Sequence, residues 1–274
     1  YQRRVRGMNQ EAKDFLEKCG ITEQEYNDST DAEELKSCLI LKNKRYDVIF
    51  KNKSFKFIFA PYLEFTKEDM FRNNQSLLEV YAPNISEMEY GCFYMCSSLI
   101  CVNFPLLESV PTHCFTRCDT LTKVNFPKAK SVSQYGFFYC SLLEEFEAES
   151  LESVGSDGFT NCCQLNIFVT PKLVKVETQG FGNCSKLNKI YAPLIDESFE
   201  CNCKKCPRCN GGFQKAKLIK NLNEHAKSCS KLQIIEDKEV RQMKQYQRLI
   251  RKAKTDLDLV VESVQELCCQ FGFE

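Results

Sequence analysis

Residues 93–114, FYMCSSLICVNFPLLESVPTHC, run directly into residues 115–136, FTRCDTLTKVNFPKAKSVSQYG, and the two stretches align position for position. The same pattern returns every 22 residues between residues 58 and 195, giving six units. A unit of this length cannot bury its own apolar side, so each one must cover its neighbour. The period therefore predicts a solenoid of stacked coils.

Each unit carries the same apolar columns. The phenylalanine column is Phe71, Phe93, Phe115, Phe137, Phe159 and Phe181. Three residues later come Asn74, Cys96, Cys118, Cys140, Cys162 and Cys184. The leucine column is Leu77, Leu99, Leu121, Leu143, Leu165 and Leu187, and the valine column is Val80, Val102, Val124, Phe146, Phe168 and Ile190. Between the valine column and a following proline the residues alternate. This predicts a strand with Val102 and Phe104 in the core, ended by a proline that cannot donate to a ladder.

These columns resemble those of the BspA-like branch of the leucine-rich repeat family, whose units carry the run F-x-x-C-x-x-L-x-x-I-x-I-P. Six units match and cover about half of the chain, with departures at Asn74, Ala129 and Glu149. The resemblance implies a recognition surface, found in that family on many surface-exposed proteins, and it assigns no catalytic residue to the repeat. We therefore expect a binding protein.

The N-terminal residues 1–56 are expected to cap the array, because an exposed first coil would leave an apolar face in water. Apolar residues at helical spacing predict a helix over residues 9–19. Two capping boxes, Thr22-x-x-Glu25 and Asp31-x-x-Glu34, predict two further helix starts.

Residues 46–59 alternate on both sides of Asn52-Lys53 and predict a β-hairpin. Because Ile58 falls in the valine column, the second strand of this hairpin is expected to be the first rung of the solenoid.

The strand positions that point away from the core predict one continuous solvent-facing sheet where a protein partner would dock. They are Glu79, Tyr81, Cys101, Asn103, Lys123, Asn125, Glu145, Glu147, Ile167, Val169, Lys189 and Tyr191. An uncommitted polar surface is the alternative. The chain has only two histidines and no phosphate-cradling glycine loop, so no catalytic arrangement can be assembled and we expect no enzyme.

The pair Cys206-x-x-Cys209, followed by His225-x-x-x-Cys229, predicts a structural zinc site. A C-x-x-C knuckle supplies two ligands, and a His and Cys four residues apart on a helix supply two more. The segment resembles a CCHC-type zinc finger. Free surface cysteines are the alternative, and Cys201 or Cys203 could replace one of the ligands.

The other cysteines are informative about the compartment. Five of the 18 cysteines, from Cys96 to Cys184, form the column described above, so we expect buried, unlinked thiols with raised pKa; redox sensing is the alternative. Together with the zinc ligands they favour a reducing, cytoplasmic environment. Neither a signal peptide nor a membrane span is visible, but Tyr1 is not Met, and a signal sequence upstream of it would favour a surface adhesin.

The C-terminal part of the chain differs in charge from the array. Residues 201–254 carry 15 Lys and Arg against 4 Asp and Glu, whereas residues 57–200 carry 10 against 18. A nucleic-acid contact through 201–254 is therefore an alternative function, although the basic residues could also neutralise the acidic array. A heptad pattern over residues 243–271 predicts either a homodimeric coiled coil or a helix that caps the array.

The sequence thus predicts an α/β repeat fold: a leucine-rich-repeat solenoid of six coils with a helical N-terminal cap, a small zinc finger and a long C-terminal helix. The corresponding domains are residues 1–56, 57–200, 201–230 and 231–274. The identity of the partner and the oligomeric state are not determined by the sequence.

Overall fold

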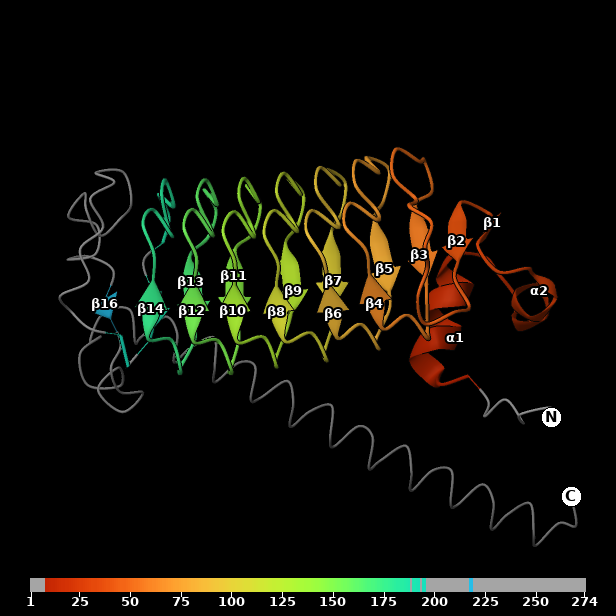
Figure 1. Ribbon diagram of the computed structural model, residues 1–274, viewed down its shortest axis with the longest axis horizontal. Helices are drawn as coiled ribbons and strands as arrows, with labels where there is room; N and C mark the ends of the chain where they lie inside the picture. The colour runs from red at the N-terminus through yellow and green to blue at the C-terminus, as the bar shows by residue number, and fades with distance from the viewer. Residues whose placement is uncertain (1–7, 188, 193, 196–216, 219–274) are drawn as a thin grey trace, which may run out of the picture. The chain divides into compact units, whose positions relative to one another are not determined.

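The computed structural model describes residues 8–187, 189–192, 194–195 and 217–218. These residues form a β-solenoid whose coils stack along one axis, with two short helices at its N-terminal end (Figure 1). The predicted zinc ligands and the predicted C-terminal helix lie outside the described residues.

One side of the solenoid is built from the strands that carry the valine column. They are β3 (Phe57–Phe59), β5 (Glu79–Tyr81), β7 (Cys101–Asn103), β9 (Lys123–Asn125), β11 (Glu145–Glu147), β13 (Ile167–Val169) and β15 (Lys189–Tyr191). All neighbours that pair do so in parallel and in the register of the repeat, as in Ile58↔Val80 and Phe146↔Phe168. The prediction that Ile58 lies on a rung of the solenoid is confirmed, but a parallel strand and a packed turn precede it, so it does not begin the array.

The predicted continuous sheet is instead divided in two. Strands β1-β2-β3-β5-β7-β9 form one sheet and β11-β13-β15-β16 form another, with no ladder between β9 and β11. Strand β16 (Lys217–Leu218) pairs in parallel with β15, with Ile190 opposite Leu218. Since β16 lies between Cys209 and His225 in the sequence, it falls inside the segment predicted as a zinc finger.

A second row of short strands, not predicted from the sequence, runs along another side of the coils. These strands are β4 (Phe65–Thr66), β6 (Glu87–Met88), β8 (Ser109–Val110), β10 (Ser131–Val132), β12 (Ser153–Val154) and β14 (Lys175–Val176). They form a two-stranded sheet, β4-β6, and a four-stranded sheet, β14-β12-β10-β8. Both described helices precede the array, so the predicted α/β character is wrong for these coils. In each coil, turns and a short strand, rather than a helix, connect one strand of the valine column to the next.

Stacked rings fill the interior of the coils. The centroids of Phe93, Phe115 and Phe137 follow one another at 5.6 and 5.2 Å, and these rings are fully buried. Each column cysteine donates its thiol hydrogen to the carbonyl of the phenylalanine 25 residues earlier, as Cys140 Sγ does to Phe115 O at 3.1 Å. The aromatic column and the thiol column therefore join each coil to the one before it.

Asn74 takes the place of cysteine in the first of these rungs and makes two hydrogen bonds. Its Nδ2 donates to Phe50 O at 2.9 Å, and its Oδ1 accepts from Lys53 N at 2.5 Å. Phe50 stacks on Phe71 at 6.1 Å, so residues 46–53 belong to the turn side of a coil. The predicted hairpin around Asn52-Lys53 is therefore wrong, since its first arm packs as part of the array and forms no strand.

The actual hairpin joins β1 (Glu33–Leu35) to β2 (Cys38–Ile40) through Lys36 and Ser37, both at positive φ. Two consecutive left-handed residues match the right-handed twist of the flanking strands. The helix start predicted at Asp31-x-x-Glu34 is consequently wrong. Strand β2 then pairs in parallel with β3 and extends the sheet beyond the first coil.

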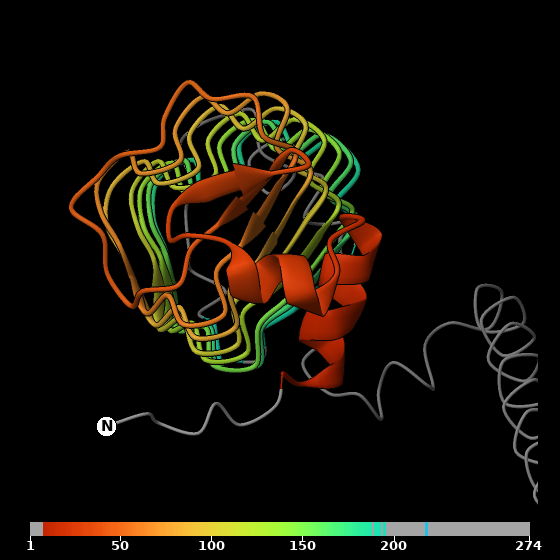
Figure 2. The same cartoon turned by 90° about the vertical axis from the view of Figure 1, so that its right-hand side faces the viewer.

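The two helices are α1 (Gln10–Lys18) and α2 (Glu23–Asp28). The Asn9 side chain accepts from Ala12 N at 2.8 Å and begins α1, and both hydrogen bonds of the Thr22–Glu25 capping box begin α2. Viewed along the stack, α1 lies beside the coils and α2 lies in front of their N-terminal end (Figures 1 and 2). They form a second apolar cluster that includes Leu16, Tyr26 and Phe59, so the predicted N-terminal cap packs against the side of the sheet.

Candidate functional site: the strand face

The outward side chains of β5, β7, β9, β11 and β13 form what we call the strand face. At its N-terminal end the face is covered by α1. The Lys18 ammonium forms an ion pair with Glu79, and Tyr81 Oη donates to Asn9 Oδ1 at 3.0 Å. The ring of Phe15 packs 5.6 Å from that of Tyr81. Two of the twelve predicted partner residues, Glu79 and Tyr81, are thus engaged by the chain itself.

The covering of these strands has a physical cause. Phe57 and Phe59 point away from the array core, and with Tyr81 they make an aromatic surface on its first coils. Phe15 packs against all three rings, at centroid distances between 5.6 and 6.1 Å. An apolar patch of this kind is costly in water, and the apolar stripe of α1 removes it.

The middle of the strand face contains a groove of about 600 Å³. Six predicted partner residues line it: Cys101, Asn103, Lys123, Asn125, Glu145 and Glu147. Val102, Thr122, Val124 and Glu144 complete its lining. The structure therefore brings half of the predicted set together, on β7, β9 and β11.

The groove lies where the ladder between β9 and β11 is interrupted. On the N-terminal side the ladder is intact, and Phe104 N donates to Asn125 O at 3.1 Å. On the C-terminal side it resumes, and Ala148 N donates to Val169 O at 3.0 Å. At the interruption Val124 is only half-buried, whereas Val102 is 3% exposed. The break therefore exposes backbone edges and part of one core side chain.

The polar groups of the groove are unevenly distributed. Asn125 Nδ2 donates to Asn103 Oδ1 at 2.8 Å and so bridges β7 and β9. Lys123 is exposed on β9, opposite the exposed carboxylates of Glu145 and Glu147 on β11. The wall of the groove formed by β7 and β9 therefore presents two amides and a cation, and the wall formed by β11 presents carboxylates.

The remaining predicted residues follow towards the C-terminus. Ile167 and Val169 are half-buried on β13, and the backbone of Lys189 and Tyr191 forms β15. An adjoining depression of about 550 Å³ is lined by polar side chains: Glu144, Glu145, Gln164, Asn166, Ser185 and Lys186. The Asn166 Oδ1 atom is buried and has no hydrogen-bond partner within the part of the chain that the structure describes.

A family model for the BspA type leucine rich repeat region, which spans six copies of the repeat, matches residues 44–162 and 108–229. The chain belongs to this family. The two matches overlap and together cover more than half of the chain, including β16. No curated protein matches the chain.

Three solved structures of bacterial proteins are similar to parts of this BspA-type chain. A leucine-rich repeat protein from Bacteroides ovatus is 23% identical over 50% of this chain and 37% of its own, with a TM-score of 0.46. One from Eubacterium ventriosum is 22% identical over 52% and 41%, with a TM-score of 0.48. A leucine rich cell surface protein from Faecalibacterium prausnitzii is 15% identical over 56% and 60%, with a TM-score of 0.38. The chain spans less than half the length of the first two.

The column thiols of the BspA-type coils are buried. Burial raises the pKa of Cys96 to about 12 and raises those of Cys118, Cys162 and Cys184 well above the usual value. All eleven cysteines of the described residues are unlinked, as predicted for the column, and the exposed one is Cys163. Within these residues no three metal-ligating side chains converge, and no helix is both long and apolar enough to cross a bilayer.

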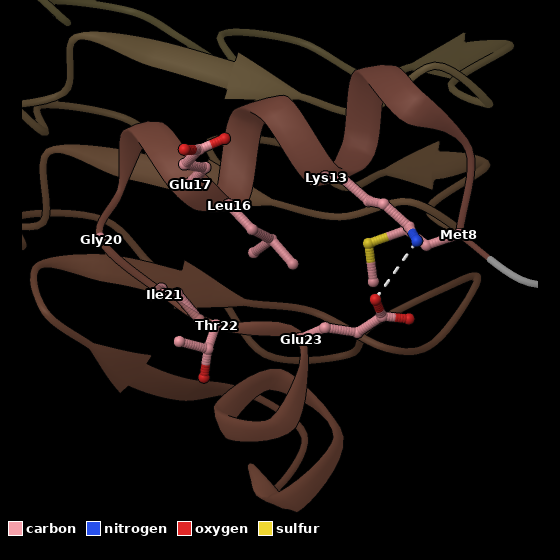
Figure 3. A pocket seen from close by; sticks show the side chains of 8 residues that line it. All are labelled: Met8, Lys13, Leu16, Glu17, Gly20, Ile21, Thr22 and Glu23. Atoms are coloured by element: carbon pink, nitrogen blue, oxygen red, sulfur yellow. Dashed lines mark ion pairs between the residues drawn. The ribbon is translucent and has the colours of Figure 1, made fainter. Parts of the chain in front are cut away.

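The cap holds a further hollow of about 390 Å³, which no sequence pattern predicted. Figure 3 shows the Leu16 side chain pointing into it, with Lys13 and Glu23 facing each other. The Lys13 Nζ and Glu23 Oε2 atoms are 3.3 Å apart. Since this ion pair is exposed and Thr22 is engaged in the capping box of α2, we assign the hollow no chemistry.

Proposed function

We propose that this chain is a non-enzymatic protein-interaction module whose partner docks on the strand face, in the groove formed by β7, β9 and β11. The observation that carries the proposal is the interrupted ladder between β9 and β11, where six of the predicted partner residues line one groove. The covered residues Glu79 and Tyr81 are excluded from the proposed contact.

The chemistry of the groove supports a protein partner. Half-buried Val124 and Cys101 provide an apolar floor, and Lys123, Glu145 and Glu147 provide a charged rim. An apolar centre with a polar rim is the usual composition of a protein interface. Backbone groups that lack a ladder partner, at the edges of β9 and β11, also offer main-chain hydrogen bonds to an incoming segment.

The experiment places a photo-crosslinking residue at Asn125 in the full chain and identifies the protein captured in an extract of the source cells. The same residue at Lys175, exposed on β14 in the other row of strands, is the control. We expect a partner that is captured from position 125 and not from position 175. Equal capture from both positions would contradict the proposal.

The affinity of the purified partner for variants of the chain then shows whether the partner contacts the groove or only lies near it. Glu147→Lys reverses one charge on the groove rim, and Lys175→Glu reverses one elsewhere. We expect Glu147→Lys to weaken binding at least tenfold and Lys175→Glu to change it less than twofold. A partner that is indifferent to Glu147→Lys does not use the groove.

Three further predictions concern residues 201–274, of which the structure describes only 217–218. They are the zinc site at Cys206, Cys209, His225 and Cys229, the nucleic-acid contact through 201–254, and the homodimer through 243–271. A steep salt dependence of binding to DNA or RNA would favour the nucleic-acid alternative over the strand face. The cytoplasmic placement, with the cell surface as its alternative, also stays a prediction.

A further inference from the structure

A row of aromatic side chains lies on the turns of the central coils, outside the strand face. We call it the aromatic ridge: Tyr90, Tyr94, His113, Tyr135, Phe138 and Tyr139. His113 stacks on Tyr135 at 4.6 Å and receives Tyr90 edge-on at 5.5 Å. Tyr90 and Tyr139 are 41% and 38% exposed, so the ridge is a surface feature although its rings contact one another.

The backbone beneath the ridge adopts the left-handed conformation in two columns, one residue of each column per coil. The first column is Asp69, Gly91, His113, Tyr135, Asp157 and Gln179, and the second is Asn73, Met95, Arg117, Tyr139, Asn161 and Asn183. Glycine, asparagine and aspartate adopt this conformation most readily. The end coils mostly carry these residues, whereas the central coils carry His113, Tyr135, Met95, Arg117 and Tyr139.

Local backbone preference therefore does not explain the central residues. Residues in a disfavoured conformation persist only where the surrounding structure holds them there, and such positions cluster at functional sites. Here five of them lie within the ridge or beside it. The unfavourable backbone positions and the exposed aromatic rings are two separate observations, and they coincide on the same turns.

Two guanidinium groups flank the ridge. Arg72 lies 4.6 Å from the centroid of Tyr94 and pairs with Asp69 at 2.9 Å. Arg117 lies 5.2 Å from the centroid of Tyr139, and no ion pair to it occurs within the described part of the chain. One face of each of these two tyrosines is thus covered by a cation, and His113 is stacked on Tyr135 and meets Tyr90 and Tyr94 edge-to-face. What remains open are ring edges and the exposed guanidinium of Arg117, which interacts with the Asp119 carboxylate without forming a direct ion pair.

We propose that the aromatic ridge is a second docking surface, and that it takes an acidic protein segment with apolar side chains between its carboxylates. Ring edges carry the positive end of the aromatic quadrupole, and guanidinium and phenol groups donate hydrogen bonds to carboxylates. Bases and sugars stack on open ring faces, whereas in the ridge a guanidinium covers one face each of Tyr94 and Tyr139, and His113 stacks on Tyr135. Tyrosine, methionine and arginine are also the residues enriched at protein interfaces.

The dimensions of the ridge limit the contact. Neighbouring coils are about 4.8 Å apart, so the three rungs from Tyr90 to Tyr135 span about 10 Å. An extended chain covers this length with three or four residues at about 3.3 Å each. The expected ligand is therefore a short linear segment with carboxylates at close spacing, and Arg117 is its anchor.

The experiment selects a display library of random 12-residue peptides on the full chain and measures the enriched peptides by fluorescence anisotropy. The test variant is Arg117→Asn/Tyr139→Asn, which installs the residue type that Asn161 and Asn183 already show in the same column, so the fold is retained. The matched control is Lys123→Asn, which removes one cation from the strand face. It loses the same charge without touching the ridge.

We expect enriched peptides to combine Asp or Glu with aromatic or aliphatic residues. The double variant should weaken them at least tenfold, and Lys123→Asn should weaken them less than twofold. The proposal is overturned if nothing is enriched, if the enriched peptides are basic, or if the double variant binds them as wild type does. A twelve-residue oligothymidine that competes with the peptides and is lost in the same variant would overturn it in favour of nucleic acid. Loss of binding in Lys123→Asn alone would move the site to the strand face.

Discussion

The strand face and the aromatic ridge belong to the same coils and rest on the same core, but their backbones differ. On the strand face, positions such as Lys123 and Asn125 sit in extended backbone, which accepts nearly any side chain. On the ridge, Tyr139 and Arg117 sit at φ of 62° and 58°, where a side chain with a Cβ is disfavoured. A large residue therefore says more about function on the turns than on the strands.

The largest effect is expected from removing the core that both surfaces share. Phe137→Ala deletes a fully buried ring stacked between Phe115 and Phe159, and should lower the free energy of unfolding by about 3–5 kcal/mol. Its neighbour Phe138, half-buried on the ridge, is the control, and Phe138→Ala should cost clearly less. Urea denaturation of both variants measures this. Equal losses would show that ridge and core are not separate layers.

A smaller effect is expected at alkaline pH, where the thiol column titrates. Burial raises the folded-state pKa of Cys96 to about 12 from an ordinary value of 9.0, and raises the pKa of Cys140 as well. The protonated thiol is thus favoured by folding, so its contribution is complete below pH 9 and is lost as the pH rises above it. Each buried thiol should cost about 1 kcal/mol between pH 9 and pH 10.

Urea denaturation in the presence of reductant at pH 8, 9 and 10 tests this. The Cys140→Ala variant is the reference, because it shares every other titrating group with wild type. Its stability should fall less steeply over the same interval. Parallel curves for the two proteins would mean that the Cys140 thiol is as accessible as one in the unfolded chain.

The contrast between the two backbones predicts a change of sign. Met95→Asn places asparagine at φ of 59° and should raise the free energy of unfolding by about 1 kcal/mol. Lys123→Asn places the same residue in a strand, where it is disfavoured, and should lower it by a few tenths of a kcal/mol. Thermal unfolding of both variants gives the comparison directly. If both substitutions changed the free energy of unfolding in the same direction, the left-handed backbone would no longer support a functional role for the ridge residues.

The smallest effect on either surface is expected from metal removal. Purified chain should contain one zinc, which Cys229→Ser or His225→Ala should abolish. Because the coils have their own core, chelation should leave the unfolding of the array and both surfaces unchanged. Atomic absorption before and after chelation, followed by a melt, measures both. A chelated protein whose whole array melts earlier would mean that β15 and β16 depend on the metal.

The buried columns were predictable because a single period constrains all of them. Phe93, Cys96, Leu99 and Val102 are all buried in the structure, as their spacing predicts. The Thr22–Glu25 box was predictable for a similar reason, since a cap depends on four neighbouring residues. The equivalent box at Asp31 failed because the turn at Lys36 and Ser37 determines the local structure there.

The groove and the ridge were not predictable in the same way. Val124 and Val102 occupy the same column and are followed by the same residues, Asn-Phe-Pro, yet the ladder beyond β9 is interrupted and that beyond β7 is not. Nor does local sequence indicate that α1 lies over Tyr81, since this contact joins Phe15 to a residue in the second rung. The ridge had a visible signal, because His113 and Tyr135 share a column with Asp69 and Asp157; only the structure shows that this column is left-handed.

Asn74 shows that a residue of one coil can depend on the structure of the coil before it. In the regular coils the turn is closed by its own backbone, as when Cys96 N donates to Phe93 O at 3.2 Å, and the next cysteine only has to donate. In the first coil Lys53 N donates to the Asn74 side chain, which also donates to Phe50 O. In this turn Lys53 N and Phe50 O do not bond to each other; each bonds to the Asn74 amide instead, Lys53 N to its oxygen and Phe50 O to its nitrogen. A thiol has a single proton and is a weak acceptor, so a cysteine would not replace both bonds. A departure from the repeat consensus can thus be a compensation for an irregular loop one coil away, and editing such an array requires changing the two positions together.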